Sequence, residues 1–174
     1  MDISNRKLRV DLTGLLKTSY KRLDLPIPDQ RSKEDIQYSD FRTTLLHGSG
    51  LNKANLQFQR RETLNNATLI YNLNGGLKNS WQDELNFNAV KLLLIKNRET
   101  TVGRILQVRF KNEIYYIGPN GFRLIGEPYM EGIQSILSSD SSEEGSIIFS
   151  TDTDITFDVV IIGSSEESSS SSGA

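Results

Sequence analysis

The chain has 174 residues, 36% of them hydrophobic, with 20 Lys/Arg against 22 Asp/Glu, one histidine and no cysteine. This length suits one domain with terminal extensions, and the low hydrophobic content predicts that part of the chain lies outside the core. The lack of cysteine excludes disulfide bridges and thiolate chemistry, and a lone His47 disfavours multi-histidine metal centres and proton relays. No apolar run approaches the ~20 residues of a membrane span, and the first residues lack the apolar stretch of a secretory signal. We therefore expect a non-enzymatic protein with no cofactor, no metal and no membrane attachment.

Charge is distributed unevenly along the chain. Residues 1–61 carry 12 basic against 7 acidic residues, residues 62–126 carry 8 against 5, and residues 127–174 carry 10 acidic residues and no basic one. A basic start and an acidic end favour head-to-tail contacts between copies, or a different partner for each end. Solvation of both ends is the alternative.

Residues 1–45 are difficult to fold by themselves. Residues 6–25 mix leucines with basic residues without a clean helical or strand period, and Pro26 and Pro28 then impose extended backbone. We predict an extended basic arm over residues 1–45 that becomes ordered on another protein. Its expected partner-binding residues are Arg6, Lys7, Arg9, Leu12, Leu15, Leu16, Lys17, Lys21 and Arg22.

From residue 46 onward, short apolar alternations are separated by Gly, Asn and Pro. The expected strands, in chain order, are NLQFQR, ATLIYNL, AVKLLLIKN, RILQVRF, EIYYIG, FRLIG, GSIIFS and ITFDVVIIG, with turn signals at Asn74-Gly75-Gly76, Lys111-Asn112 and Pro119-Asn120-Gly121. AVKLLLIKN is nearly all apolar, as in a central strand covered on both faces. Many short strands at close spacing predict an all-β fold, an antiparallel β-sandwich of jelly-roll type over residues 46–163.

The same-face positions of these strands give the expected core. It consists of Leu56, Phe58, Leu69, Tyr71, Leu92, Leu94, Val108, Phe110, Val159 and Ile161.

One segment favours a helix. In NSWQDELNF, Ser80 is an N-cap candidate with Asp83 three residues later, and two helical turns fit before Leu85. Trp81 would anchor this helix to the sandwich as a covering plug, which we favour over a ligand-stacking role. The chain then ends in residues 164–174, whose serines and glutamates predict a flexible acidic tail.

Few residues suggest chemistry. His47, the only imidazole, lies beside glycines with no acid nearby in sequence, so a turn or interface position is favoured over catalysis. Asp152 and Asp154 alternate on an extended segment that continues to Asp158, and this run could share a hard cation such as calcium. Protection of a strand edge by acidic residues explains the same run.

Basic and aromatic residues interleave in VRFKNEIYY. Nucleic-acid binding usually needs a denser positive surface than an overall pI of 5.5 provides, so an amphipathic strand is the preferred interpretation. A carbohydrate-binding module is a second possible class, because jelly rolls present sugars to Tyr and Trp side chains. That class needs Trp81, or the Tyr115 and Tyr116 pair, exposed in a groove. A hydrolase would need two carboxylates converging in a cleft.

Three blocks of sequence occur in a set order. The first, HGSGLNKANLQFQRRETLNNATLIYNLNGGLKNSWQDELNFNAVKLLLIKN, contains a glycine turn, a first strand, a leucine-glycine strand end, an aromatic connector and a lysine-containing strand that ends in Ile-x-Asn. The second is YYIGPNGFRLIGEP, and the third is ITFDVVIIGSS, in which an aromatic-Asp-β-branched run stops at Gly163. As a set they resemble a recurrent family of tailed-bacteriophage virion structural proteins. The resemblance is carried in the first block by Gly48, Gly50, Ala54, Leu56, Leu64, Leu73, Gly75, Trp81, Phe87, Val90, Lys91, Ile95 and Asn97.

The resemblance spans residues 47–163 and departs from the family at Gly118-Pro119-Asn120-Gly121, where the family has an Arg-Pro-Gly-Gly-like turn, and in the short serine-rich stretch before GSIIFS. It implies a non-enzymatic component of a phage particle, and within this class we expect a capsid-associated decoration protein. A tail, collar or fibre-base component is the alternative. It also implies other virion proteins as partners and a location in the virion. We further expect a homo-oligomer, for which a trimer is one arrangement.

Overall fold

The computed structural model describes residues 9–20, 35–48, 51, 53–79, 82–126, 133–134 and 145–165. All regular structure in these ranges is β, and none of them contains a helix. The strands are β1 (Val10–Tyr20), β2 (Asp35–His47), β3 (Lys53–Ala54), β4 (Leu56–Asn65), β5 (Thr68–Asn72), β6 (Asn74–Lys78), β7 (Glu84–Asn86), β8 (Ala89–Asn97), β9 (Leu106–Phe110), β10 (Glu113–Ile117), β11 (Phe122–Gly126), β12 (Ile133–Gln134), β13 (Ser146–Ser150) and β14 (Asp154–Ser164).

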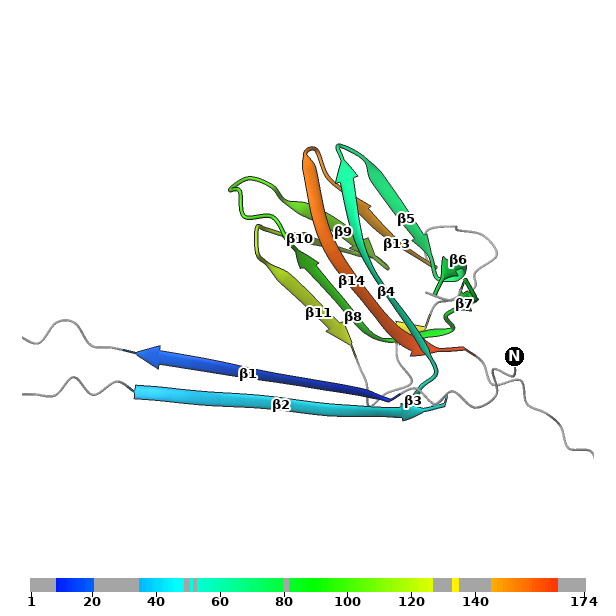
Figure 1. Ribbon diagram of the computed structural model, residues 1–174, viewed down its shortest axis with the longest axis horizontal. Helices are drawn as coiled ribbons and strands as arrows, with labels where there is room; N and C mark the ends of the chain where they lie inside the picture. The colour runs from blue at the N-terminus through cyan, green and yellow to red at the C-terminus, as the bar shows by residue number, and fades with distance from the viewer. Residues whose placement is uncertain are drawn as a thin grey trace, which may run out of the picture. The chain divides into compact units, whose positions relative to one another are not determined.

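Two antiparallel sheets pack face to face and confirm the predicted β-sandwich (Figure 1). One sheet has the order β10-β9-β13-β5, and the other has the order β11-β8-β14-β4, with β12 pairing β8 beside β11. Each strand predicted from the sequence is present, and AVKLLLIKN forms β8 with the predicted bounds. β8 pairs β11 on one side and β14 on the other, so it is an interior strand of its sheet.

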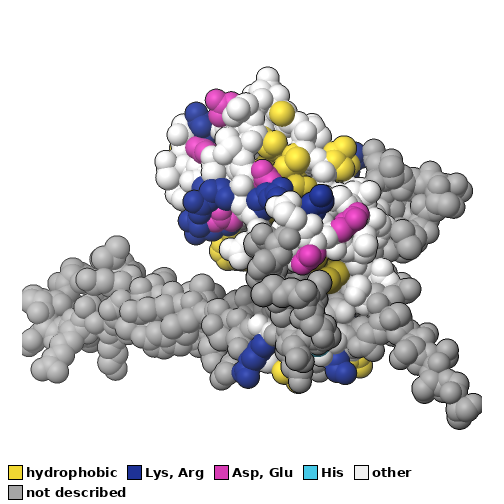
Figure 2. All heavy atoms as spheres, turned by 45° about the vertical axis from the view of Figure 1, so that its right-hand side comes forward, with side chains coloured by type: hydrophobic (Ala, Val, Ile, Leu, Met, Phe, Trp, Pro, Cys, Tyr) yellow, Lys and Arg dark blue, Asp and Glu magenta, His cyan; other side chains and the backbone are white. Residues whose placement is uncertain are grey.

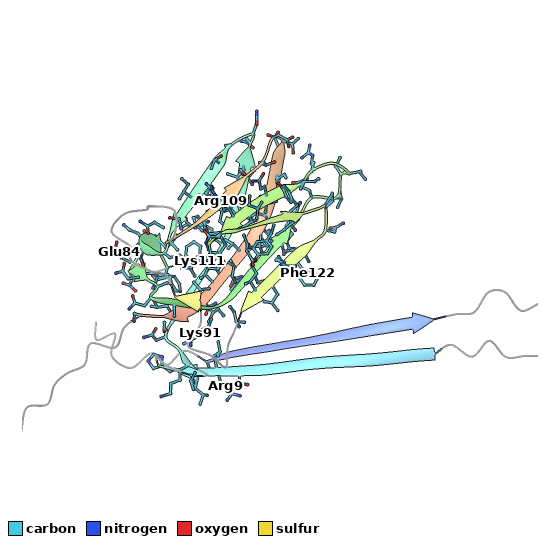
Figure 3. All side chains as sticks on the ribbon, turned by 180° about the vertical axis from the view of Figure 1, so that it is seen from behind. Arg9, Glu84, Lys91, Arg109, Lys111 and Phe122 are labelled. Carbon is cyan, nitrogen blue, oxygen red and sulfur yellow. The ribbon has the colours of Figure 1, made fainter. Side chains whose placement is uncertain are left out.

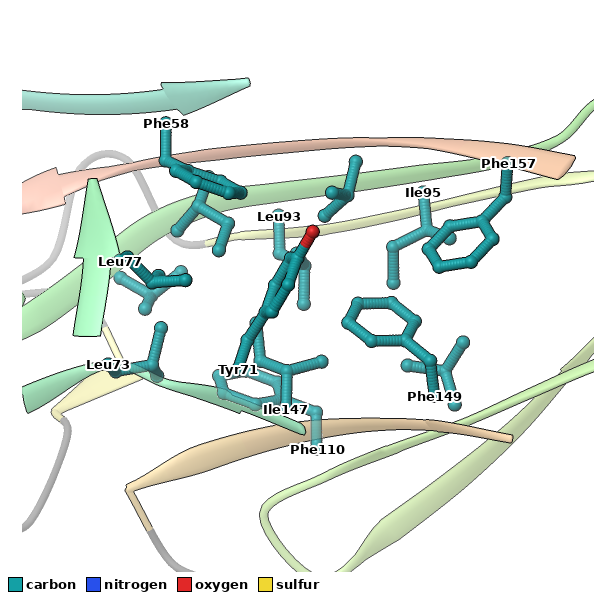
Figure 4. Packing of buried hydrophobic residues seen from close by; sticks show 14 of the residues in the cluster. Phe58, Tyr71, Leu73, Leu77, Leu93, Ile95, Phe110, Ile147, Phe149 and Phe157 are labelled. Carbon is teal, nitrogen blue, oxygen red and sulfur yellow. The ribbon is translucent and has the colours of Figure 1, made fainter. Parts of the chain in front are cut away.

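Aromatic side chains join the two sheets. Phe58 and Phe157 come from the sheet that contains β14, whereas Tyr71 and Phe149 come from the facing sheet (Figure 4). Tyr71 meets Phe58 and Phe149 edge to face with ring centroids 5.2 and 5.3 Å apart, and Phe149 stacks on Phe157 at 4.9 Å. Such pairs add about 0.5–1.5 kcal/mol each beyond the burial of their area.

The Tyr71 hydroxyl has a hydrogen-bond partner within this core. It donates a 2.6 Å hydrogen bond to Glu62, whose carboxylate lies 3.6 Å from Arg60. Burial, followed by the bond to Glu62, raises the pKa of Tyr71 well above its usual range. The phenol therefore remains a hydrogen-bond donor at neutral pH.

Most of the predicted core is confirmed, but the prediction of which β8 side chains face the core is wrong. Leu93 and Ile95 lie fully buried in the cluster between the sheets. Leu92 and Leu94, which were predicted there, lie on the opposite face of β8. The strand is apolar at nearly every position, so alternation cannot identify its inner face. A bulge adds to the difficulty, because β14 steps from Ile162 to Gly163 while β8 skips a residue at Lys91.

The predicted helix is also wrong. Glu84–Asn86 forms β7, which pairs antiparallel with β6, and Ser80 and Trp81 lie outside the described residues. The Asn79 side chain accepts a 3.0 Å bond from the Asp83 amide and donates one of 3.0 Å to the Asp83 carboxylate. These bonds pair the polar groups of the turn between β6 and β7 locally, as Asn and Asp side chains do in turns. Within this turn Gln82 has φ of 70°. Gly75 and Gly76, predicted as a turn, instead form an irregular part of β6 with φ of 120° and 87°.

Residues Val10–Thr44 make up a separate compact unit that contains β1 and most of β2. β1 neighbours β2 in a sheet of order β1-β2-β3, and β3 pairs with β2 only at Leu46 and His47.

At the other end of the chain, β14 continues to Ser164, and Ser165 exchanges hydrogen bonds with the Asn55 side chain. The predicted tail beyond residue 165 lies outside the described residues.

Candidate interaction surface

The outer face of the four-stranded sheet carries exposed apolar side chains. Its register places Ile70, Ile148, Arg109 and Ile114 in one row across β5, β13, β9 and β10. Ile70 is 59% exposed and Ile114 is 49% exposed, and Tyr116 in the next row is 68% exposed. The space-filling view shows hydrophobic side chains lying beside Lys and Arg on the sandwich (Figure 2). In the same row Ile148 is only 9% exposed and Arg109 is charged, so the exposed apolar side chains of this face lie on its two edge strands, β5 and β10.

β10 is the edge strand of this sheet, and its end is fixed by a buried amide. Asn97, fully buried at the end of β8, donates from Nδ2 to the carbonyls of Ile117 and Arg104 at 2.9 and 3.0 Å. Its Oδ1 accepts the Glu99 amide at 3.0 Å. One side chain thus satisfies two backbone groups of the β8–β9 connection and the carbonyl of the last residue of β10, which it holds in place.

The gap between β10 and β11, which belong to different sheets, is covered by a cation–π contact. The Arg123 guanidinium lies over the Tyr115 ring at 4.6 Å, and the Tyr115 hydroxyl donates to Glu113. Partial burial, followed by the bond to Glu113, raises the pKa of Tyr115. Tyr115 therefore points between the sheets while Tyr116 points outward. The tyrosine pair does not form the shared platform that the carbohydrate-binding hypothesis needs, and Trp81 lies outside the described residues.

The aspartates of the cation hypothesis do not converge. Asp158 lies on the outer face of β14 between Arg61 and Arg98, at 2.8 and 2.5 Å. The hydrogen bond from Arg61 is the main cause that holds the pKa of Asp158 below its usual range, and Arg98 adds to it. Asp152 precedes β14 and Asp154 begins it. The described residues contain no group of three or more possible metal ligands from His, Cys, Asp and Glu.

The remaining sequence candidates are dispersed. His47 lies exposed at the end of β2, opposite Ala54 of β3. Of the arm residues, Leu12, Leu15, Leu16 and Lys17 lie on β1, and Arg9 is exposed just before it (Figure 3). Arg6, Lys7, Lys21 and Arg22 lie outside the described residues. Lys91, part of the phage-like block, is fully buried at the bulge of β8.

Sequence reasoning identified EIYYI as a strand but missed Ile70 and Ile114 as surface residues, and it raised Tyr116 only together with Tyr115 as a possible sugar platform. Whether a strand lies at an edge depends on the order of the sheet, which local sequence does not contain.

No protein-family model, curated protein or solved structure matched this chain. Among the described residues there is no helix long and apolar enough to cross a membrane.

Proposed function

We propose that this protein is a non-enzymatic structural component of a tailed-bacteriophage virion, a decoration-type protein that attaches to the capsid through its amino-terminal segment. The proposal joins the sequence resemblance to one structural observation, the separate strand unit Val10–Thr44. A tail, collar or fibre-base position is the alternative within the same class.

The strand unit carries the argument because it is too small to be stable by itself. β1 has 11 residues and β2 has 13, and within Val10–Thr44 the described strands make only a two-stranded ribbon. A two-stranded ribbon is at best marginally stable in water and gains stability by packing on a further surface. A neighbouring virion protein would supply that surface.

The charge of this segment indicates the kind of partner. Between Arg6 and Arg22 there are six basic residues and one acid, Asp11. An acidic protein lattice would attract such a segment over about 8 Å at physiological ionic strength. Exposed ion pairs contribute only about 0–1 kcal/mol each, so burial of leucines in the same segment must supply much of the affinity.

The acids of the sandwich support a structural role. Glu62 accepts from Tyr71, Glu99 from Arg104 and the Thr156 amide, and Asp158 from two arginines. Each of these carboxylates stabilises a connection between strands or loops. Such groups are poorly suited to act as a general acid or base, which needs a proton it can exchange with a substrate.

Location is tested on particles. Virions produced from the genome that encodes this chain should retain it through density-gradient purification, and fractionation into capsids and tails should place it with capsids. Recovery with tails would favour the alternative position. Absence from purified particles would overturn the proposal.

Attachment is tested with variants of the basic segment. Lys21→Glu with Arg22→Glu should slow binding to particles and flatten its salt dependence. The matched control is Arg60→Glu with Lys78→Glu, two exposed basic residues on β4 and β6, outside the β1-β2-β3 sheet, that give the same change in net charge. Equal effects of the two pairs would exclude the segment as the anchor, as would unchanged binding after deletion of residues 1–44.

A further inference from the structure

The described strands leave one side of β10 unpaired. The β9–β10 loop has two residues, so Phe110 and Glu113 form a hydrogen-bonded pair, and such pairs recur at every second position along the ladder. Ile114 and Tyr116 occupy the alternate positions. Their amides and carbonyls consequently point away from β9, toward a side on which the described strands provide no partner.

This edge lacks the protection that the facing sheet has. The edge strand β4 carries Arg60, Arg61 and Glu62 in succession, charges of the kind that prevent edge-to-edge pairing. β10 carries one charge, Glu113 at its first residue, and no Lys, Arg, Pro or bulge; Ile114 and Tyr116, whose backbone groups point away from β9, have exposed side chains.

The sequence of β10 allows the strand to pair antiparallel with β10 of a second copy. If a two-fold axis passes at Tyr115, Ile114 of one copy lies opposite Tyr116 of the other, and each pair exchanges two backbone hydrogen bonds. Glu113 then faces Ile117, so no like charges lie opposite each other. On the outer face, exposed Ile114 packs beside exposed Tyr116, a pairing of aromatic and β-branched side chains that favours strand association.

We propose that β10 is a self-association edge, which pairs with β10 of a second copy about a two-fold axis at Tyr115. The two four-stranded sheets then form one continuous eight-stranded sheet. The row Ile70, Ile148, Arg109, Ile114 of one copy continues into the Tyr116 row of the other. The inference concerns the isolated chain and does not rest on a location in a virion.

The register is tested by cross-linking, which is simple in a chain without cysteine. Opposed residues of a hydrogen-bonded pair have Cα atoms about 5.5 Å apart, within reach of a disulfide, whereas diagonal positions lie about 7–8 Å apart. A mixture of Ile114→Cys and Tyr116→Cys chains should therefore form covalent dimers at least tenfold faster than either chain alone. Ile70→Cys mixed with Tyr116→Cys gives the rate for random collisions. A rate for the first mixture equal to this background overturns the proposal.

The edge is tested separately by charge. Ile114→Lys or Tyr116→Lys in the full chain should raise the dimer dissociation constant at least tenfold in sedimentation velocity. Ile70→Lys, which places the same charge on the same sheet face at its other edge, should leave the constant within about twofold. All three side chains are about half exposed or more, and thermal melts confirm that each variant folds. A chain that remains monomeric, or a dimer that Ile70→Lys weakens as strongly, contradicts the proposal.

Discussion

Replacing Asn97 by aspartate is the sharpest test of how the sandwich end is held together. The two side chains have nearly the same shape, so the change creates no cavity. It removes both Nδ2 donors and leaves the carbonyls of Ile117 and Arg104, at 2.9 and 3.0 Å, facing a carboxylate. The bond from the Glu99 amide to Oδ1 is retained.

The expected cost follows from that geometry. A buried acceptor left without its donor costs about 1–3 kcal/mol, so two of them cost about 2–6 kcal/mol. Burial and two facing carbonyls raise the pKa of the new carboxyl above its unfolded value of about 3.9. The folded variant then binds more protons than the unfolded one, so its deficit is full at high pH and shrinks as the pH falls through the raised pKa.

The assay is urea denaturation of wild type and Asn97→Asp at pH 8 and pH 4.5, with Asn112→Asp, in an exposed turn, as the control. The deficit of Asn97→Asp should exceed about 2 kcal/mol at pH 8 and be smaller at pH 4.5. The control should stay within about 0.5 kcal/mol of wild type. A deficit of Asn97→Asp below about 1 kcal/mol at pH 8, or one that does not change with pH, would refute the reasoning.

Three further predictions can be measured by the same denaturation experiment. Leu93→Ala should lower the free energy of unfolding by about 2–5 kcal/mol because Leu93 is fully buried between the sheets. Leu94→Ala, on the other face of β8, should cost less than half as much. The reverse order would show that Leu94 faces the core, as predicted from the sequence. Gln82→Gly should stabilise the protein by about 0.5–1 kcal/mol because Gln82 has φ of 70°, which favours glycine. In a helix the same substitution would destabilise the protein by about 1 kcal/mol. The sign of the change therefore distinguishes the observed turn from the predicted helix. Asp158→Asn should lower stability by up to about 1 kcal/mol near neutral pH. Because the folded pKa of Asp158 is depressed, this difference should vanish as the pH falls through that pKa, and a difference that persists in acid would contradict the ion-pair origin.

Strand positions were predictable because their signals are local. The bounds of β8 follow from a nine-residue apolar run, and the β9–β10 turn follows from two polar residues between alternating segments. The inner face of β8 was not predictable, because burial on both sides removes the alternation that would distinguish Leu93 from Leu94. The helix prediction failed because Ser80 and Asp83 match a capping pattern, while Asn79 satisfies the same backbone through its side chain.

The residues that matter most for the candidate surface depend on tertiary arrangement. Asn97 ends an Ile-x-Asn motif, yet its role comes from carbonyls 7 and 20 residues away in sequence. Ile114 and Tyr116 are ordinary strand residues until the order of the sheet makes β10 an edge. In β1, by contrast, the apolar residues Val10, Leu12, Leu16 and Tyr20 alternate with mostly polar ones, a strand pattern that the leucines and basic residues around it obscured.

The central place of β14 has a consequence for synthesis on the ribosome. β4 and β8 do not pair with each other, because β14 lies between them and hydrogen-bonds to both. Until residues 154–164 have been made, β4 and β8 lack the strand that joins them, and Phe58 and Tyr71 lack the stacked pair Phe149 and Phe157. Contacts between segments so distant in sequence make folding slow and expose strand edges meanwhile. The nascent chain should therefore need shielding by chaperones over most of its synthesis, and a ribosome stalled before residue 154 should release an aggregation-prone fragment.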